Sequence, residues 1–387
     1  MGRKGLQVLC LSVLKEPWKF HCNNIPNKKH FSNGFRNSIP YYISTMFSRL
    51  LILISVLCVS VGTHASLLER FQQWSVDHNI ELPSVEDSRF MHMLANWRDN
   101  DHLIAETNAK NLSYTLGHNQ FSAFNREEFR ALMNFEYNSA LIGAAEESKM
   151  VRSSIELPLS LAASVDWRSK GAVTPVKDQG QCGSCWSFST TGALEGAYAI
   201  KNSNLVSFSE QQLVDCDYIR AGGTSLGCNG GDMSSAMDWI GKNNGLCTES
   251  AYPYVSGTTK TNGACQKSCS IVSGSDVSKH VDVAANSDSA MMTAIAQQPV
   301  SIAIEADQSS FQLYKSGVFT GSCGTNLDHG VLLVGYGTMS AGDYYILKNS
   351  WSNTWGDGGY MYIGRGSQYN GGKGQCGLLM QGVYPAL

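Results

Sequence analysis

Gln179-Gly180-Gln181-Cys182-Gly183-Ser184-Cys185-Trp186 is the stretch around which the chain is organised. Its glycines and serine suit a tight loop, and the residues from Cys185 onward can form a helix with Trp186, Leu194 and Tyr198 available for burial. We expect Cys185 at the helix N-terminus, where unpaired N–H groups and the positive end of the helix dipole favour a thiolate. Because the thiolate is the nucleophilic form of cysteine, the stretch predicts a reactive thiol.

The segment Cys182-Gly183-Ser184-Cys185-Trp186 resembles the active-site segment of papain-like cysteine proteases, the cathepsin L type in particular. The resemblance covers roughly residues 66–387. It implies an α+β, papain-like two-lobe fold, with a helical lobe, a β-barrel-like lobe and an active-site cleft between them, preceded by a helical propeptide. The partners it implies are protein and peptide substrates, the chain's own propeptide as inhibitor and cystatin-like inhibitors. It implies no cofactor.

The composition fits a globular protein without a nucleic-acid partner. The chain has 387 residues, of which 43% are hydrophobic and 16% charged, and its formal net charge is -3. This suffices for a sizeable core, and the charge gives no reason to expect nucleic acid. We expect no metal, since Cys265-x3-Cys269 lacks a second ligand pair at finger spacing. Gly366 to Lys373 lacks the Ser or Thr of a phosphate loop, and we interpret it as a surface turn.

Residues 46–65 are predicted to be a secretory signal peptide. Arg49 precedes the apolar run from Leu50 to Val61, and Thr63-His64-Ala65 offers a small-residue cleavage site. The run is short for a bilayer span, which takes about 20 residues, although a signal anchor is the alternative. We therefore expect the secretory pathway, then the lysosome, the vacuole or the extracellular space, with no membrane association after signal removal. Residues 1–45 are interpreted as an N-terminal extension or a gene-model artefact.

Residues 66–135 are predicted to form the helical inhibitory propeptide, because apolar residues recur at three-to-four spacing up to about residue 112. Four residues match the propeptide pattern of papain-like zymogens: Trp97, Asn100, Ile104 and Asn108. Asn125 to Phe129 resembles the family's short capped helix. The chain departs from the family patterns at four positions: Arg89, Met93, Ala123, where an acidic residue is usual, and Ser352, where glycine is usual.

Residues 136–160 lose this periodicity and are predicted to be a linker that is cleaved during activation. The mature start is expected near Leu157 to Ala162, and the peptidase domain over residues 161–387. Asn111-Leu112-Ser113 is an N-glycosylation sequon that would leave with the propeptide. The propeptide contains four histidines: His78, His92, His102 and His118. Their protonation near pH 5 to 6 would loosen the hold of the propeptide on the peptidase domain. The alternative is that these histidines are solvated on polar faces and have no such role.

Within the peptidase domain, a mostly helical half up to Lys242 precedes a half rich in strands. Beside the Cys185 helix, helices are predicted at Ser209 to Val214 and Met233 to Ile240. Four strands are predicted, at Val300 to Ile304, Val331 to Val334, Tyr344 to Lys348 and Tyr360 to Ile363. A helical half followed by a β half suggests two lobes with a cleft between them.

Two histidines are candidates for the catalytic base. Of nine histidines, only His280 and His329 follow the expected mature start. A cysteine protease needs a base that holds its thiolate and protonates the leaving amine. His329 follows Cys185 by 144 residues, within the rough interval of 130 to 150 for this family. His280 has polar neighbours and is expected to be solvated. We predict that His329 is the base; the alternative is a structural histidine.

Three further residues complete the predicted catalytic site by resemblance. Asn349 occupies the third catalytic position, where an amide accepts from the imidazole N–H, and Trp351 can shield that hydrogen bond from water. Gln179 and the Cys185 backbone N–H are the predicted oxyanion donors. Taken alone, Asn349 would be a turn residue and Gln179 a loop residue.

The segment with Gly230 and Gly231 resembles the glycine strip that holds the substrate backbone, where glycine permits close approach. The resemblance also implies a pocket for the side chain two residues before the cleaved bond, lined by Met233, Ala303, Leu327 and, at its base, Gln381. Because three of the lining residues are apolar, we expect the substrate to carry Leu, Val or Phe two residues before the cleaved bond. The neutral Gln381 argues against strong acceptance of Arg.

An odd number of cysteines, nine, follows the propeptide, so one stays free or pairs with another chain. Eight paired cysteines allow 105 connectivities, and the sequence does not choose among them. The resemblance implies three pairs: Cys182 with Cys228, Cys216 with Cys265, and Cys323 with Cys376. We assign the remaining Cys247 and Cys269 to each other, which leaves Cys185 free.

The resemblance therefore implies a cysteine endopeptidase, a hydrolase synthesised as a zymogen; no occluding-loop insertion is evident. One alternative is a thiol-disulfide oxidoreductase, which would need Cys182 and Cys185 free together. The other alternative is a catalytically silent papain-fold binding protein.

Overall fold

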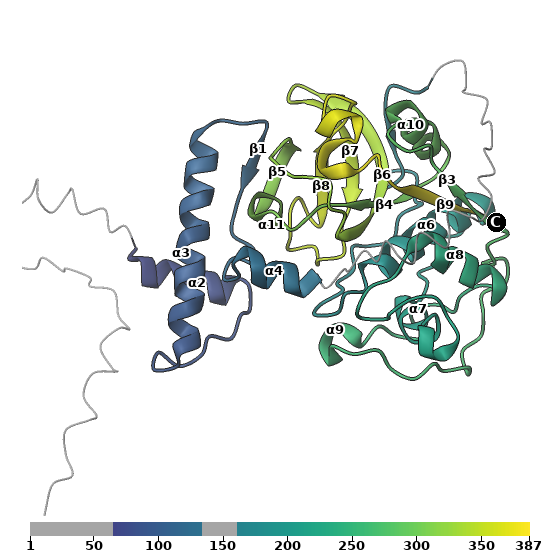
Figure 1. Ribbon diagram of the computed structural model, residues 1–387, viewed down its shortest axis with the longest axis horizontal. Coiled ribbons are helices and arrows are strands. Elements are labelled where there is room, and N and C mark those ends of the chain that lie inside the picture. The colour runs from purple at the N-terminus through teal and green to yellow at the C-terminus, as the bar shows by residue number, and fades with distance from the viewer. Residues whose placement is uncertain (1–64, 134–160) are drawn as a thin grey trace, which may run out of the picture. The chain divides into compact units, whose positions relative to one another are not determined.

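The structure is a computed structural model that describes residues 65–133 and 161–387 (Figure 1). We refer to residues 65–133 as the N-terminal region and to residues 161–387 as the C-terminal region. The predicted leader up to residue 64 and the predicted linker, residues 136–160, lie outside the described residues. Within the two regions, no helix is long and apolar enough to cross a membrane.

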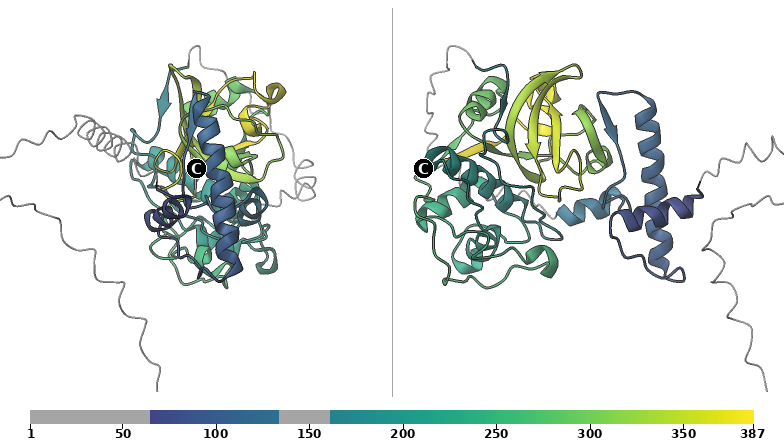
Figure 2. Two further views of the ribbon diagram at one scale, coloured as in Figure 1. Left: turned by 90° about the vertical axis from the view of Figure 1, so that its left-hand side faces the viewer. Right: turned by 180° about the vertical axis from the view of Figure 1, so that it is seen from behind.

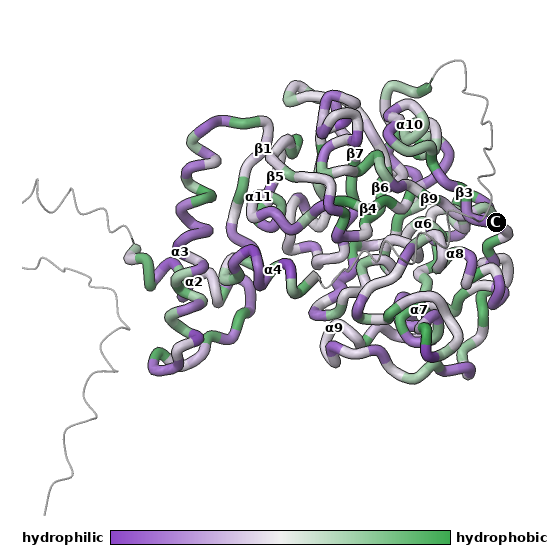
Figure 3. Tube along the Cα trace, in the orientation of Figure 1, coloured by the Kyte–Doolittle hydropathy of each residue, from purple (hydrophilic) through white to green (hydrophobic). Residues whose placement is uncertain are grey.

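The N-terminal region is mainly helical, as predicted. Its elements are α2 (Leu67–Asp77), α3 (Ser88–Ala109), β1 (Tyr114–Leu116) and α4 (Arg126–Met133). Ser66 and Glu69 form a reciprocal capping box that starts α2. Aromatic side chains form the small core of this region: Phe71, Trp74, Phe90 and Trp97. Along α3, hydrophobic and hydrophilic stretches alternate (Figure 3).

The two asparagines of the propeptide pattern hold the segment that follows α3. Asn100 Nδ2 donates to the carbonyl oxygens of Ser122 and Phe124, each at 3.0 Å. Asn108 exchanges two hydrogen bonds of 2.9 Å with the backbone of Leu116 in β1. These amides therefore satisfy backbone groups that would otherwise lack partners.

The helical lobe of the C-terminal region is built on α6 (Cys185–Asn202), whose side chains are buried on every face up to Ala199. Such a helix belongs in a core, because it has no polar face to expose. Ser209 caps α7 (Glu210–Cys216) and Asp232 caps α8 (Met233–Lys242). The remaining helices of this region are α9 (Ser256–Thr259), α10 (Asp288–Gln297) and α11 (Ser309–Gln312), with short 3-10 turns at Ile219–Ala221, Asn370–Gly372 and Gln375–Gly377.

The β lobe contains a mixed sheet in the order β1-β5-β8-β7-β6-β4-β9-β3, with β2 paired to β6. Its strands are β2 (Val165–Asp166), β3 (Lys279–Asp282), β4 (Val300–Ile304), β5 (Tyr314–Phe319), β6 (His329–Met339), β7 (Gly342–Lys348), β8 (Tyr360–Gly364) and β9 (Gly382–Ala386). The neighbours are antiparallel except β5 and β8. The four predicted strands are confirmed, whereas β1, β2, β3, β5 and β9 were not predicted.

Three features of this arrangement position the candidate site. The two lobes lie side by side, with α6 next to the sheet (Figures 1 and 2). In the register of β4 and β6, Ile304 lies opposite His329, so the start of β6 lies at the end of β4. The N-terminal region adds β1 to the sheet as an edge strand on β5.

Candidate active site

Cys185 and His329 come from different lobes and meet where α6 begins and β6 begins. Cys185 is the first residue of α6, and its Sγ atom accepts a hydrogen bond from the Gly330 backbone N–H at 3.4 Å. His329, the residue before Gly330, is fully buried. The structure therefore brings the predicted nucleophile and the predicted base to the same place.

His329 contacts two residues named from the sequence, Asn349 to orient the ring and Trp351 to shield their hydrogen bond. Its Nε2 atom lies 2.8 Å from Asn349 Oδ1. An amide oxygen can only accept, so Nε2 carries the hydrogen and Nδ1 keeps a free lone pair. The Trp351 ring stacks on the imidazole with the ring centroids 4.6 Å apart. Among the described residues, Nδ1 of His329 has no hydrogen-bond partner.

Burial opposes the thiolate that the helix N-terminus favours. Burial raises the pKa of the Cys185 thiol to about 12, despite backbone N–H groups that act in the opposite direction. Burial likewise lowers the pKa of the His329 imidazole to about 4, although Asn349 opposes this shift. Desolvation disfavours both charged forms, and here it outweighs the helix N-terminus. Both shifts are in the direction that favours the neutral thiol and the neutral imidazole.

Gln179 is buried beside this pair, and its amide is held at both ends. Its Oε1 atom accepts from the Ser350 hydroxyl at 2.7 Å, and its Nε2 donates to the Cys182 carbonyl at 3.1 Å. The Tyr254 hydroxyl donates to the Gln179 carbonyl at 2.8 Å. Sequence reasoning gave no role to Ser350 or Tyr254. Ser350 stood beside Asn349 in the matched motif, whereas no local signal marks Tyr254.

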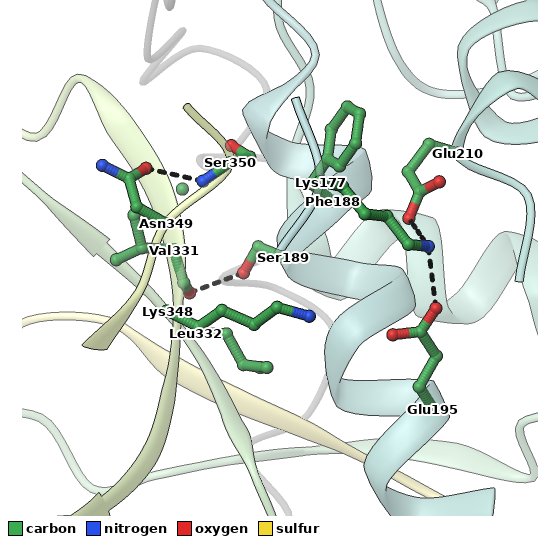
Figure 4. A pocket seen from close by; sticks show the side chains of 11 residues that line it. Lys177, Phe188, Ser189, Glu195, Glu210, Val331, Leu332, Lys348, Asn349 and Ser350 are labelled. Carbon is green, nitrogen blue, oxygen red and sulfur yellow. Dashed lines mark hydrogen bonds and ion pairs between the residues drawn. The ribbon is translucent and has the colours of Figure 1, made fainter. Parts of the chain in front are cut away.

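A buried cluster of charged side chains links the lobes behind the site and lines a pocket there (Figure 4). Lys177 Nζ lies 2.8 Å from Glu195 Oε1 in α6 and 2.6 Å from Glu210 Oε1 in α7. Lys348, the residue before Asn349, donates to Thr174 Oγ1 at 2.9 Å, and Thr174 donates to Glu195 at 2.6 Å. The end of β7 is thereby tied to α6. The sequence did not reveal this cluster.

The charges in this cluster affect one another strongly. Burial alone would lower the pKa of Lys177, but the carboxylates of Glu195 and Glu210 raise it above its ordinary value. Burial lowers the pKa of Lys348 to about 8. Removing one partner would leave a buried charge uncompensated, which is costly. The cluster therefore helps fix Asn349 relative to α6.

The glycine strip lies next to the Cys185 loop. The Gly183 N–H donates to the Cys228 carbonyl at 2.9 Å, and Gly230 has a φ of +106°. A Cβ atom on Gly231 would lie 2.5 Å from the Trp186 ring. Glycine is therefore required here by packing against Trp186, whatever the strip binds.

The structure also brings together the residues named for the side-chain pocket. Met233, Ala303 and Leu327 are buried in one hydrophobic cluster. Gln381 is half-buried, and its Nε2 donates to Asp232, the residue before Met233, at 3.0 Å.

The four disulfides of the structure join the pairs named from the sequence. They are Cys182–Cys228, Cys216–Cys265, Cys247–Cys269 and Cys323–Cys376. Cys185 is the free cysteine of the described regions.

His280 departs from its sequence-based expectation. It lies on β3 rather than free in solvent, its side chain is only 25% exposed, and Nδ1 is 2.6 Å from Asp238 Oδ1. The hydrogen bond to Asp238 raises the pKa of His280. Pairing of β3 with β9 holds the histidine against α8, so it is a structural residue away from Cys185.

The N-terminal region packs on the β lobe at the candidate site. The rings of Phe121 and Phe129 contact Trp351, with centroids 5.6 and 5.3 Å apart. Gln120 Nε2 donates to the Trp351 carbonyl at 2.7 Å, and Asn119 Nδ2 donates to the Gln312 carbonyl at 2.7 Å. The tryptophan that stacks on His329 is thereby covered.

Comparison with known families identifies both regions. The model for the papain family cysteine proteases matches residues 161–386. The model for the cathepsin propeptide inhibitor domain matches residues 71–129.

Individual proteins similar to this chain are also cysteine proteases. The probable cysteine protease RD21B of Arabidopsis thaliana is 42% identical over 81% of this chain, and the match spans 65% of RD21B. The KDEL-tailed cysteine endopeptidase CEP2, also of Arabidopsis thaliana, is 42% identical over 84% of this chain and 87% of CEP2. The digestive procathepsin L 3 of Tenebrio molitor has a TM-score of 0.71 at 38% identity, over 84% of this chain and 100% of that structure. The chain belongs to the papain family of cysteine proteases and carries the family's propeptide inhibitor domain.

Proposed function

We propose that this protein is a cysteine endopeptidase whose nucleophile is Cys185. In the activated protein, His329 takes the thiol proton, and the thiolate attacks the scissile carbonyl carbon. His329 then protonates the leaving amine, and water hydrolyses the thioester. Asn349 keeps the imidazole in the tautomer described above. The observation that carries this proposal is the meeting of the Cys185 thiol with the oriented, buried His329 ring.

We assign the stabilisation of the oxyanion to two hydrogen-bond donors. Gln179 Nε2 has a second hydrogen beyond the one given to Cys182, and the Cys185 backbone N–H stands at the start of α6. Both can stabilise the negative charge that develops on the carbonyl oxygen.

Substrate preference is assigned to the glycine strip and the apolar pocket. Gly230 and Gly231 would bind the extended substrate backbone. The walls formed by Met233, Ala303 and Leu327 favour Leu, Val or Phe two residues before the cleaved bond, because burial of such side chains is favourable. A peptide panel in which Arg outperforms Leu at that position would contradict this assignment.

The zymogen has its activation cleavage within residues 136–160, near the expected mature start. We propose passage through the secretory pathway to a lysosome, a vacuole or the extracellular space. The predicted signal peptide and the four disulfides support this, because disulfides persist in oxidising compartments. Cystatin-like inhibitors are proposed partners of the activated protein.

The test is acidification of the purified precursor to about pH 4 to 5, with mass and hydrolysis of a Leu-Arg fluorogenic peptide followed over time. The expected result is a mass drop that ends near Leu157 to Ala162, together with activity that Cys185→Ala abolishes. A correctly trimmed and folded protein without activity would favour the catalytically silent binding protein instead. The oxidoreductase alternative is disfavoured because Cys182 is bonded to Cys228.

A further inference from the structure

Two arginines of the N-terminal region hold a carboxylate of the β lobe. Arg126 Nη2 lies 3.2 and 3.1 Å from the two carboxylate oxygens of Asp307, and Arg130 Nε lies 3.9 Å from Oδ2. The Asp307 side chain is 6% exposed, and those of Arg126 and Arg130 are 48% and 68% exposed. Gln308 donates a further hydrogen bond to Asp307 at 3.0 Å. When the N-terminal region leaves, Asp307 keeps Gln308 and loses both cations.

Asp307 lies on the same side of the site as His329. It follows Ile304, the last residue of β4, which pairs with His329 across the sheet. The intervening Ala306 N–H donates to Asp328 Oδ1 at 2.7 Å, and Asp328 directly precedes His329.

Helix α4 links Asp307 to the catalytic tryptophan. Arg126 pairs with Asp307, and Phe129, three residues later, packs on Trp351. Side chains three apart on a helix are neighbours, with Cβ atoms about 5 to 6 Å apart. Helix α4 therefore contacts both Asp307 and Trp351, the ring that stacks on His329.

The direction of the substrate follows from the chemistry. The acid that protonates the leaving amine must be next to the new N-terminus of the departing product. The chain after the cleaved bond therefore begins at His329, beside the surface that α4 covers. An extended chain advances about 3.3 Å per residue, so side chains one to three residues after the cleaved bond lie within about 10 Å of His329.

We propose that Asp307 in the activated protein binds a basic side chain, Arg or Lys, located one to three residues after the cleaved bond of the substrate. The incoming side chain takes the place of Arg126 and Arg130; the inference rests on the proposed function. A guanidinium suits a carboxylate because charge-assisted hydrogen bonds are strong.

A neighbouring carboxylate adds to the selectivity. Glu305 accepts from the Gly324 and Asn326 backbone N–H groups and from Gln308. Its hydrogen-bond donors carry no full positive charge, so the local potential favours cations and disfavours acidic side chains.

The test uses internally quenched peptides with Leu two residues before the cleaved bond. Arginine, citrulline or glutamate occupies each of the three positions after that bond in turn. kcat/KM is measured at low ionic strength for the acid-activated wild type, Asp307→Asn, Asp307→Lys and the matched control Asp343→Asn. Asp343 pairs with Arg365 at the start of β7, so its removal changes net charge equally without touching this surface.

We expect the wild type to favour arginine over citrulline by about three- to tenfold at one position, as for a partly exposed ion pair. Asp307→Asn brings this ratio to about one, Asp307→Lys shifts the preference toward glutamate, and Asp343→Asn changes nothing. About 0.5 M sodium chloride should weaken the wild-type preference, a measurement that needs no variant.

Three outcomes overturn the inference: no arginine preference in the wild type, a preference that survives in folded Asp307→Asn, or a preference that salt leaves unchanged. Hydrolysis of the citrulline peptide reports whether each variant is folded. A wild-type protein that hydrolyses none of the peptides would contradict the proposed function itself. Hydrolysis without charge preference would contradict only the role of Asp307.

Discussion

Ser350 donates its hydroxyl hydrogen to Gln179 Oε1 across 2.7 Å and thereby joins the residue after Asn349 to the proposed oxyanion donor. An amide side chain can present either its oxygen or its nitrogen to a substrate. Because Ser350 engages the oxygen and Cys182 one of the two Nε2 hydrogens, the remaining hydrogen is left for the oxyanion. The orientation of the Gln179 amide, and with it the oxyanion donor, therefore depends on Ser350.

Ser350→Ala should lower kcat about tenfold and leave KM nearly unchanged. Gln179→Ala should cost more, about 100- to 1000-fold, because it removes the donor itself. Steady-state kinetics of both single variants and the double variant form a thermodynamic cycle. We expect Ser350→Ala to cost almost nothing in the Gln179→Ala background. Fully multiplicative losses would mean that Ser350 acts by another route.

Ser352→Gly should stabilise the protein by about 1 kcal/mol. Ser352 has a φ of +65°, in the left-handed region that costs a residue with a Cβ atom about 1 to 2 kcal/mol. Gly358 offers the reverse control, since its φ is +63° and a Cβ there would meet nothing within 4 Å. Gly358→Ser should therefore destabilise by a similar amount. Denaturant unfolding of both variants in the Cys185→Ala background measures the two differences, and shifts of the same sign would refute the backbone explanation.

The Cys185 thiol should be protected from alkylation in the precursor. Burial raises the pKa of the Cys185 thiol and so favours its neutral, less reactive form. Iodoacetamide labelling followed by mass spectrometry should be at least about 100-fold faster after acid activation, once the site is open to solvent. Cys185→Ser provides the unlabelled control. Equal rates before and after activation would show that the N-terminal region does not protect the thiol.

Among the propeptide histidines, His118 is the best placed to respond to pH. It is stacked on Trp97 at 4.3 Å, and Nε2 lies 3.2 Å from Asp101 Oδ1. Burial lowers the pKa of His118, although Asp101 opposes the shift; Arg70 and His78 add to the lowering. The folded form therefore favours the neutral ring. The contribution of neutral His118 to the stability of the folded protein is complete above about pH 6.5. It is lost as the pH falls through the lowered pKa of His118.

We therefore expect His118→Gln to weaken the pH dependence of thermal unfolding between about pH 7.5 and 4.5. The Cys185→Ala precursor is the suitable background, because it should not process itself. His102→Gln is the matched control, since that side chain is 74% exposed. If the two glutamine variants follow the same pH curve as the parent, His118 has no part in acid release.

The fold could be predicted where local pattern and tertiary role agree. β4 is a short apolar run buried along its whole length, and α7 and α8 lie where helices were predicted. β5 and β9 could not be predicted, because Lys315, Ser316 and Gly317 interrupt β5 and Pro385 lies in β9. Both strands are stabilised by neighbours distant in sequence: β5 pairs with β1 and β8, and β9 pairs with β3 and β4.

The site was predictable to the extent that a local motif marked each residue. Cys185, His329 and Asn349 stood in matched segments, and the structure places them together. The charge cluster around Lys177 and the contact of Tyr254 with Gln179 join segments far apart in the chain, so no spacing marks them. The sequence shows the helix N-terminus that favours the thiolate but not the burial that opposes it.

The most direct test of the central claim is to trap the covalent intermediate. The acid-activated protein is mixed with an ester or peptide substrate, quenched in acid within milliseconds and analysed by intact mass and peptide mapping. We predict one acyl group, carried as a thioester on Cys185, and none on Cys185→Ala. Hydrolysis that proceeds with an acyl group on another residue, or that persists in Cys185→Ala, would contradict the assignment of Cys185 as nucleophile.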